Sequence, residues 1–378
     1  MKFITLYHLI FLVKIKFIMK VCILGDNLTS LALAKALVKK EIFVDLFYKK
    51  KNTKIDTTRT IGISKSNIDY FIREISNINK MLWPIKKIKI FTENSNDKEI
   101  LKFEDEKDNL FSILQNQKIF NQLTIELKKS KFFKFKKYIK FRKSGNLGYD
   151  LVINCDIRNE ITKKYFSRKF EKKYDSIAFT TIIDHLKLSS NNEAIQIFTN
   201  DGPIAFLPIS KEKTSIVYSA RMKKNKTELE IIKIINKFNP KYEIKKIHKI
   251  SKFDLKSINL REYYKDNILA FGDLLHKLHP LAGQGFNMSI RDIKEFLKII
   301  DYKIKLGLPI DQNVCIEFQN NVKSKNLIFS EGINFIYEYF NYENKIGNNL
   351  IDSTARLIGQ NKILNKYFKN IADVGLQN

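Results

Sequence analysis

Residues 271–292 read FGDLLHKLHPLAGQGFNMSIRD. The stretch places an acid, Asp273, and a Gly-Gln-Gly turn at 283–285 directly before a predicted helix over Phe286–Ile300. Glycines let backbone N–H groups approach a ligand closely, and the positive end of a helix dipole favours negative charge on that ligand. The apolar run Ile268–Phe271 predicts a buried strand that delivers Asp273. The pattern therefore predicts a cradle for a flat, anionic heterocycle.

This stretch resembles the second flavin motif of the flavoprotein aromatic hydroxylases, in particular the ubiquinone-biosynthesis hydroxylase group (para-hydroxybenzoate hydroxylase-like flavoproteins). The matching positions are Gly272, Asp273, His276, Pro280, Gly283, Gln284, Gly285 and Asn287. The family usually has two small residues where this chain has Leu274 and Leu275. The resemblance implies that Asp273 binds the ribityl chain of FAD and that Pro280 lies near the flavin ring. It also implies that the amides of Gly283–Gly285 stabilise the negative charge of the reduced flavin.

The chain before this motif predicts the strand–helix–strand opening of a dinucleotide-binding fold. Its three elements are Lys20–Leu24, a helix from about Leu28 to Lys40, and Ile42–Tyr48. In the family the first turn reads GxGxxG, and the second strand ends in an acid that binds the ribose.

This chain departs from that turn. Gly25 keeps the first glycine, while Asn27 and Ser30 stand at the second and third positions and Tyr48 replaces the acid. A side chain at Asn27 obstructs the approach of backbone to phosphate, whereas Ser30 is small and costs less. Asp26 adds negative charge where the pyrophosphate is expected. Tyr48 offers one hydroxyl donor and cannot hold two ribose hydroxyls as a carboxylate does.

Three weaker segments extend the resemblance. Arg59 opens RTIGIS, a segment that faces the flavin in the family, although a surface arginine is an equal alternative. Asn116 stands where the family opens a helix; it is either a cofactor contact or a helix N-cap, and we favour the cap. DLVINCD ends at Asp156, where Ile157 replaces a family glycine.

A further segment, DGPIAFLPI at 201–209, resembles a strand of the family's substrate-side sheet. The alternation from about Ser176 to Tyr218 predicts antiparallel strands, and Lys223–Phe238 predicts a helix. Residues after 292 have the apolar spacing of helices.

The charge is extreme, with 68 basic and 40 acidic residues and a net charge of +28. Coding drift, an anionic membrane surface and nucleic acid are three explanations, and a membrane would contribute ~1 kcal/mol per nearby Lys or Arg. Lys128–Lys143 interleaves aromatics with lysines. We favour half-buried strands with solvated lysine faces there, and we expect no nucleic-acid partner.

The three cysteines are far apart, which argues for a reducing compartment without a disulfide frame. Residues 1–18 form an apolar leader that is too interrupted to span a bilayer. We expect translation to start at Met19, with a surface-binding amphipathic anchor as the alternative. His276 and His279 form an HxxH pair without further ligands nearby, so we expect no metal site.

The resemblance, which runs from Met19 nearly to the end, implies an α/β fold. A Rossmann-like FAD-binding domain is interleaved with an antiparallel-sheet substrate domain, and a C-terminal helical region follows. The expected boundaries are 19–80, 110–165 and 258–300 for the FAD-binding domain, 81–109 and 166–257 for the substrate domain, and 301–378 for the helical region.

The implied activity is that of an FAD-dependent monooxygenase using NAD(P)H and O2 to hydroxylate a polyprenylated phenol in ubiquinone biosynthesis. The substrate is expected in an apolar pocket between the flavin and the sheet carrying Phe206 and Leu207. No catalytic side chain is assigned. The expected location is the bacterial cytoplasm, peripheral on the inner membrane face and within a ubiquinone-biosynthesis complex. The alternative is a degenerate, non-catalytic relative that serves as a scaffold in such a complex.

Overall fold

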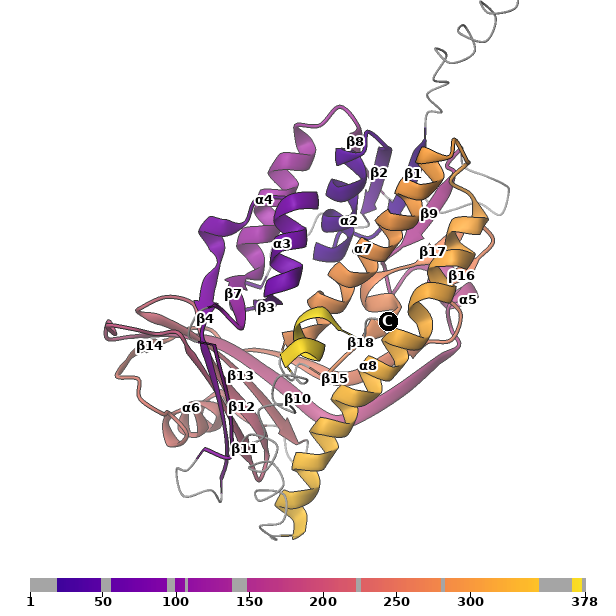
Figure 1. Ribbon diagram of the computed structural model, residues 1–378. Helices are drawn as coiled ribbons and strands as arrows, with labels where there is room; N and C mark the ends of the chain where they lie inside the picture. The colour runs from indigo at the N-terminus through magenta and orange to yellow at the C-terminus, as the bar shows by residue number, and fades with distance from the viewer. Residues whose placement is uncertain are drawn as a thin grey trace, which may run out of the picture.

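The structure is a computed structural model that describes residues 19–48, 56–93, 99–105, 108–137, 148–221, 226–279, 283–346 and 369–375. The leader 1–18 and Pro280 lie outside the described residues. Three β-sheets organise the described chain, with helices packed around them (Figure 1).

The first sheet has six strands in the order β16-β17-β9-β1-β2-β8. All neighbours pair in parallel except β16 with β17. Because β1 lies between β2 and β9, this is the strand order of a dinucleotide-binding half-fold. The strands are β1 (Lys20–Leu24), β2 (Phe43–Tyr48), β8 (Phe133–Lys137), β9 (Leu151–Asn154), β16 (Tyr264–Lys265) and β17 (Ile268–Ala270).

The second sheet has nine strands, in the order β18-β15-β10-β13-β12-β11-β5-β6 with β14 paired to β10. Its pairs are antiparallel except β11 with β5. Its strands are β5 (Lys87–Thr92), β6 (Leu101–Glu104), β10 (Lys169–His185), β11 (Glu193–Thr199), β12 (Gly202–Pro208), β13 (Lys213–Arg221), β14 (Ile244–Ile247), β15 (Ser251–Leu260) and β18 (His276–Lys277).

A third, three-stranded sheet orders β3 (Thr60–Ser64), β7 (Phe111–Gln115) and β4 (Trp83–Ile85). Hydroxyl pairs connect it to the nine-stranded sheet, because Thr58 Oγ1 lies 3.3 Å from Thr180 Oγ1 and Thr60 Oγ1 lies 2.8 Å from Ser215 Oγ. The β3 segment therefore contacts the nine-stranded sheet.

The helices cover the sheets. α7 packs against α2, α3 and α8, and α8 contacts strands of both large sheets, as Figure 1 shows. Among the described residues no helix is long and apolar enough to cross a membrane. The helices are α2 (Leu28–Lys39), α3 (Lys65–Glu74), α4 (Asn116–Lys128), α5 (Glu160–Tyr165), α6 (Glu228–Lys237), α7 (Gln284–Lys305) and α8 (Gln312–Ile346).

The predicted fold class is confirmed: a parallel Rossmann-like sheet, an antiparallel sheet and C-terminal helices are all present. The helix predicted from Phe286 begins at Gln284 and continues to Lys305. β15 starts at Ser251 and crosses the expected domain boundary at residue 258.

The aromatic and lysine-rich segment behaves as the half-buried strand we favoured over its described part. Phe133 is buried and Lys134 is exposed, so the alternation follows the two faces of β8. Residues 138–143 of the same segment lie outside the described residues.

Candidate functional site

The carboxyl ends of three neighbouring parallel strands bring the motif loops together. Gly25 follows β1 with φ +102°, and a Cβ there would lie 3.2 Å from the Cβ of Asp156, which follows β9. Gly272 follows β17 with φ +64°, and a Cβ there would lie 2.9 Å from Thr29 of α2. Close backbone approach therefore requires glycine at both positions. Ligands of such sheets bind at this edge.

The Gly-Gln-Gly turn opens α7. Gly283 is its N-cap in the left-handed conformation (φ 63°), and no side chain caps the helix. A Cβ on Gly283 would lie 3.5 Å from the backbone nitrogen of Gly62 in β3, whereas Gly285 has no such neighbour within 4 Å. The first amides of α7 therefore have no side-chain capping partner, and space is open beside Gly285. This end of the site fits an anionic planar ligand.

Asn287 fastens α7 to β3. Its Nδ2 donates to the Gly62 carbonyl at 3.1 Å, and its Oδ1 accepts from the Ser64 N–H at 3.0 Å and from Asn67 Nδ2 at 3.1 Å. The residue is 2% exposed. Its side chain therefore positions the two backbones that face each other at the turn.

Gln284 and Arg291 connect the same turn to residues near the C-terminus. Arg291 Nη2 donates to Gln284 Oε1 at 3.2 Å and to the Ala372 carbonyl at 3.1 Å. Asp373 accepts from the N–H of Ser66 through its carboxylate at 2.8 Å. The short C-terminal helix, residues 369–374, thus lies beside β3 and α7, where Figure 1 draws it in yellow. The sequence carried no signal for this contact.

The first βα turn is built differently from the family turn described above. Asn27 is the N-cap of α2, and its Oδ1 accepts from the N–H and the hydroxyl of Ser30 at 2.9 and 3.1 Å. Its Nδ2 donates to the Cys155 carbonyl at 2.9 Å. The side chain therefore occupies the place where the family has backbone alone, and it ties β1 to β9. The residues at this end do not fit a pyrophosphate held in the family's manner.

The remaining predicted site residues lie at several places. Asp273 is exposed at the carboxyl edge. Arg59 is exposed, with its guanidinium 5.6 Å from the ring centre of Phe253 on the nine-stranded sheet. Asn116 is the first residue of α4 and its N–H donates to the Arg59 carbonyl at 3.0 Å. The favoured N-cap role for Asn116 is wrong, because Gln115 holds that position, without a capping side-chain bond.

A buried acid–base pair behind the turn was not predicted as a pair. His276 Nε2 lies 2.5 Å from Asp292 Oδ2, and both side chains are 1% exposed. Asn326 of α8 donates to Asp292 Oδ1 at 2.9 Å. The pair joins β18, α7 and α8.

The neighbouring histidine packs against aromatic rings. Burial lowers the pKa of His279 to about 3, and its ring stacks on Tyr337 at 4.0 Å between centroids. A neutral, stacked imidazole is a packing group. No group of three potential metal-ligating side chains occurs among the described residues.

Phe206 and Leu207 lie on opposite faces of the nine-stranded sheet, and only the face of Leu207 is turned toward β3. Phe206 is fully buried on the opposite face, where it packs with Tyr242 and residues of α6. Phe206 therefore does not lie on the face toward β3, because alternation along β12 defines two faces without saying which one meets the third sheet. The substrate pocket expected between the flavin and this sheet stays a prediction. Leu207 lies on the other face, with Thr180 and Ser215 contacting the β3 segment. Hydroxyl groups therefore contribute to the side that faces the turn.

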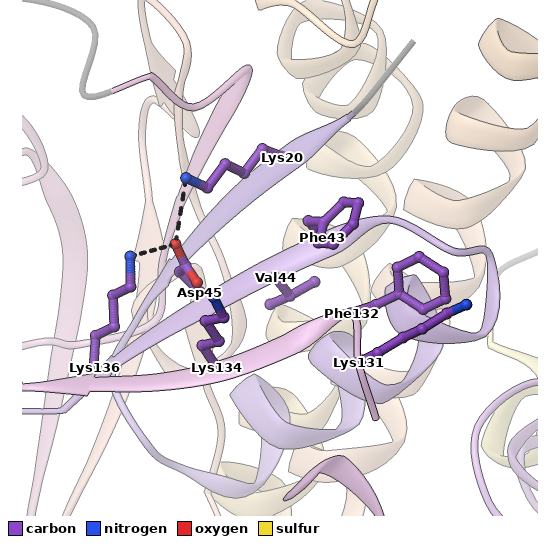
Figure 2. Close-up of a pocket in the computed structure, with 8 residues that line it drawn as sticks. All are labelled: Lys20, Phe43, Val44, Asp45, Lys131, Phe132, Lys134 and Lys136. Carbon is purple, nitrogen blue, oxygen red and sulfur yellow. Dashed lines mark ion pairs between the residues drawn. The ribbon is translucent and has the colours of Figure 1, made fainter. Parts of the chain in front are cut away.

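A basic pocket of about 270 Å³ lies at the opposite, amino-terminal edge of the six-stranded sheet. Figure 2 shows Lys20 and Lys136 reaching Asp45, with nitrogen–oxygen distances of 3.7 and 2.8 Å. Tyr149 also donates to Asp45, at 2.5 Å. Burial alone would raise the pKa of Asp45, but the hydrogen bonds from Lys136 and Tyr149 outweigh it and lower that pKa.

Comparisons with known proteins agree with this arrangement. A family model described as "FAD binding domain" matches residues 147–304, which include β9, β17 and the α7 turn. The chain is 24% identical over 269 residues to the mitochondrial ubiquinone biosynthesis monooxygenase COQ6 of Schizosaccharomyces pombe, covering 56% of each protein. It is 28% identical over 153 residues to the 3-demethoxyubiquinol 3-hydroxylase of Escherichia coli, covering 38% of this chain and 39% of that one. The chain thus spans about half, or less, of the length of these curated relatives.

Solved structures share the fold over nearly the whole chain. The p-nitrophenol 4-monooxygenase of Pseudomonas putida superposes with a TM-score of 0.79 at 12% identity, covering 96% of this chain and 99% of that one. A Klebsiella pneumoniae HpxO variant complexed with FAD gives a TM-score of 0.74 at 10% identity, covering 94% and 99%. With the motif residues gathered at one sheet edge, the chain has the fold of the para-hydroxybenzoate hydroxylase-like FAD-binding monooxygenases and matches the FAD binding domain over residues 147–304.

Proposed function

We propose that this protein is an FAD-dependent monooxygenase that hydroxylates the ring of a polyprenylated phenol in ubiquinone biosynthesis, with NAD(P)H as reductant and O2 as oxidant. The names of the curated relatives support this reaction. A bound flavin supplies the electron transfer and the oxygen chemistry, while the protein orients the partners and tunes the charge. In this reaction one O2 yields one ring hydroxyl and one water. NAD(P)H supplies two of the four electrons, and the ring carbon supplies the other two.

One observation carries the proposal: no side chain caps the N-terminus of α7, and space is open beside Gly285 in its first turn. A glycine with open space beside it lets a flat ring approach the helix N-terminus, and the helix dipole stabilises negative charge on that ring. Asp273 is exposed shortly before the same helix and offers a carboxylate to ligand hydroxyls.

The alternative function is a non-catalytic scaffold, and the first βα turn favours it. Because the Asn27 side chain caps α2, the dinucleotide end lacks the usual backbone cradle. We rank the enzyme first, because the ring end, where the chemistry takes place, keeps its glycines.

The visible spectrum of the purified protein distinguishes the two functions. Bands of bound oxidised flavin support the enzyme, and a protein that stays colourless with excess FAD supports the scaffold. We expect Asp273→Ala to lose flavin while keeping the fold, measured by flavin absorbance and circular dichroism. Asp69→Ala, which removes an exposed aspartate on α3, is the matched control and should retain flavin. Unchanged flavin content in Asp273→Ala would contradict the role given to that carboxylate.

We also propose that the protein acts at an anionic membrane surface, on the cytoplasmic side of a bacterial inner membrane and alongside other ubiquinone-biosynthesis proteins. The basic pocket supports this, since Lys131 and Lys134 line it together with Lys20, Lys136 and Phe132. Co-sedimentation should be strong with vesicles containing anionic lipid, weak with neutral vesicles, and reduced by salt. Equal sedimentation with both kinds of vesicle would argue against the proposal.

A further inference from the structure

In the turn between β1 and α2, a side chain of the protein satisfies one of the backbone donors that a dinucleotide phosphate could use. Helix N-termini bind phosphates because their first N–H groups have no intrahelical partner. In α2 the Ser30 N–H already donates to Asn27 Oδ1 at 2.9 Å, and so does the Ser30 hydroxyl at 3.1 Å. A donor satisfied by the protein's own side chain gains little from an incoming phosphate.

The amide nitrogen of Asn27 makes a second hydrogen bond that holds the side chain in the turn. Nδ2 donates to the carbonyl of Cys155, a buried residue 128 positions away in the chain, at 2.9 Å. Rotating the side chain out of the turn would therefore break hydrogen bonds at both ends of the group. Gly25 brings the same turn against Asp156, whose Cβ would lie 3.2 Å from a Cβ on Gly25.

A further feature weakens the dinucleotide half. Tyr48, at the end of β2, packs edge-on against Phe135 with ring centres 6.2 Å apart. An aromatic ring thus stands where the family has the acid that holds the ribose.

From these contacts we infer that this protein binds a flavin through its ring and ribityl end alone, and discriminates little between FAD and the mononucleotide FMN. The inference rests on the proposed function, because it requires a flavin at the α7 turn. Its consequence is a cofactor that exchanges readily, with the adenosine half of FAD contributing little affinity.

Titration of the cofactor-free protein with FAD, FMN and ADP tests the inference, with flavin fluorescence and calorimetry as readouts. We expect the dissociation constants of FAD and FMN to lie within about tenfold of each other, and ADP not to displace bound FMN. FAD binding more than about a hundredfold tighter than FMN binding would overturn the inference and leave the proposed function standing. Binding of neither flavin would overturn both.

A pair of variants sharpens the result. Asn27→Gly removes the capping side chain and restores the family's residue, so the preference for FAD over FMN should rise by at least about tenfold, the effect of one charge-assisted hydrogen bond. Thr227→Gly removes a comparable cap from α6, on the far side of the nine-stranded sheet, and should leave the ratio unchanged. An unchanged ratio in Asn27→Gly would overturn the role given to the cap.

Discussion

Replacement of Asn287 by alanine tests whether the junction between α7 and β3 is held as the structure shows. The side chain makes four hydrogen bonds, to Gly62, Ser64, Asn67 and Gly283, and the residue is 2% exposed. A neutral hydrogen bond contributes about 0.5–1.5 kcal/mol net, and a buried group left without a partner costs about 1–3 kcal/mol. We therefore expect Asn287→Ala to lower the free energy of unfolding by about 2–4 kcal/mol.

The single tryptophan makes the measurement direct. Trp83 lies in β4, in the same three-stranded sheet as the Gly62–Ser64 segment that Asn287 holds. Its fluorescence in a urea titration should shift to a lower midpoint in the variant. Asn313→Ala, at an exposed position early in α8, is the matched control and should stay within about 0.5 kcal/mol of the parent protein.

Flavin affinity gives a second readout of the same change. Because Gly62 and Gly283 would no longer be held together, Asn287→Ala should bind flavin more weakly at temperatures where it is fully folded. If both the urea midpoint and the flavin affinity match those of the parent protein, Asn287 does not hold this junction and the reasoning is refuted.

Three further predictions concern other parts of the fold. Asp45→Asn should lower the free energy of unfolding by about 1–3 kcal/mol at pH 7. Because the pKa of Asp45 is lowered in the folded protein, the stabilisation by its carboxylate is complete above the unfolded pKa near ~4 and disappears as the pH falls through the folded pKa. The urea midpoints of the two proteins should therefore converge in acid. Gly202→Ala should lower the free energy of unfolding by more than about 3 kcal/mol, because a Cβ there would lie 1.9 Å from the Ser219 carbonyl oxygen. The control Gly148→Ala has open space around it and should lower that free energy by only about 1 kcal/mol. Equal melting temperatures of the two variants would contradict this prediction. Thiol reagents should react slowly with the native protein, because Cys22, Cys155 and Cys315 are buried and burial raises the pKa of each thiol. After unfolding, the reagents should label three thiols per chain. Fast labelling of the folded protein would contradict the burial of these cysteines.

The fold class and the flavin turn could be predicted from local patterns. The strand–helix–strand opening and the run from Gly272 to Asn287 each lie within about thirty residues, the scale of one βαβ unit. Glycine positions, the apolar period and capping residues influence structure over about that many residues, so they can be recognised without the rest of the chain. Asn27 could be recognised as a departure from the family turn for the same reason.

What Asn27 does instead was decided by tertiary structure, because its partner Cys155 comes from a strand brought alongside only when the sheet forms. The same holds for Asn287 and Gly62, which are 225 positions apart, and for the C-terminal residue Asp373 beside Ser66. The orientation of Phe206 away from the site also needed the packed structure, since alternation marks two faces and only the helix that covers one of them settles which is inside. Local order follows from neighbours along the chain, whereas a site assembled from distant segments depends on how their side chains satisfy one another once water is excluded.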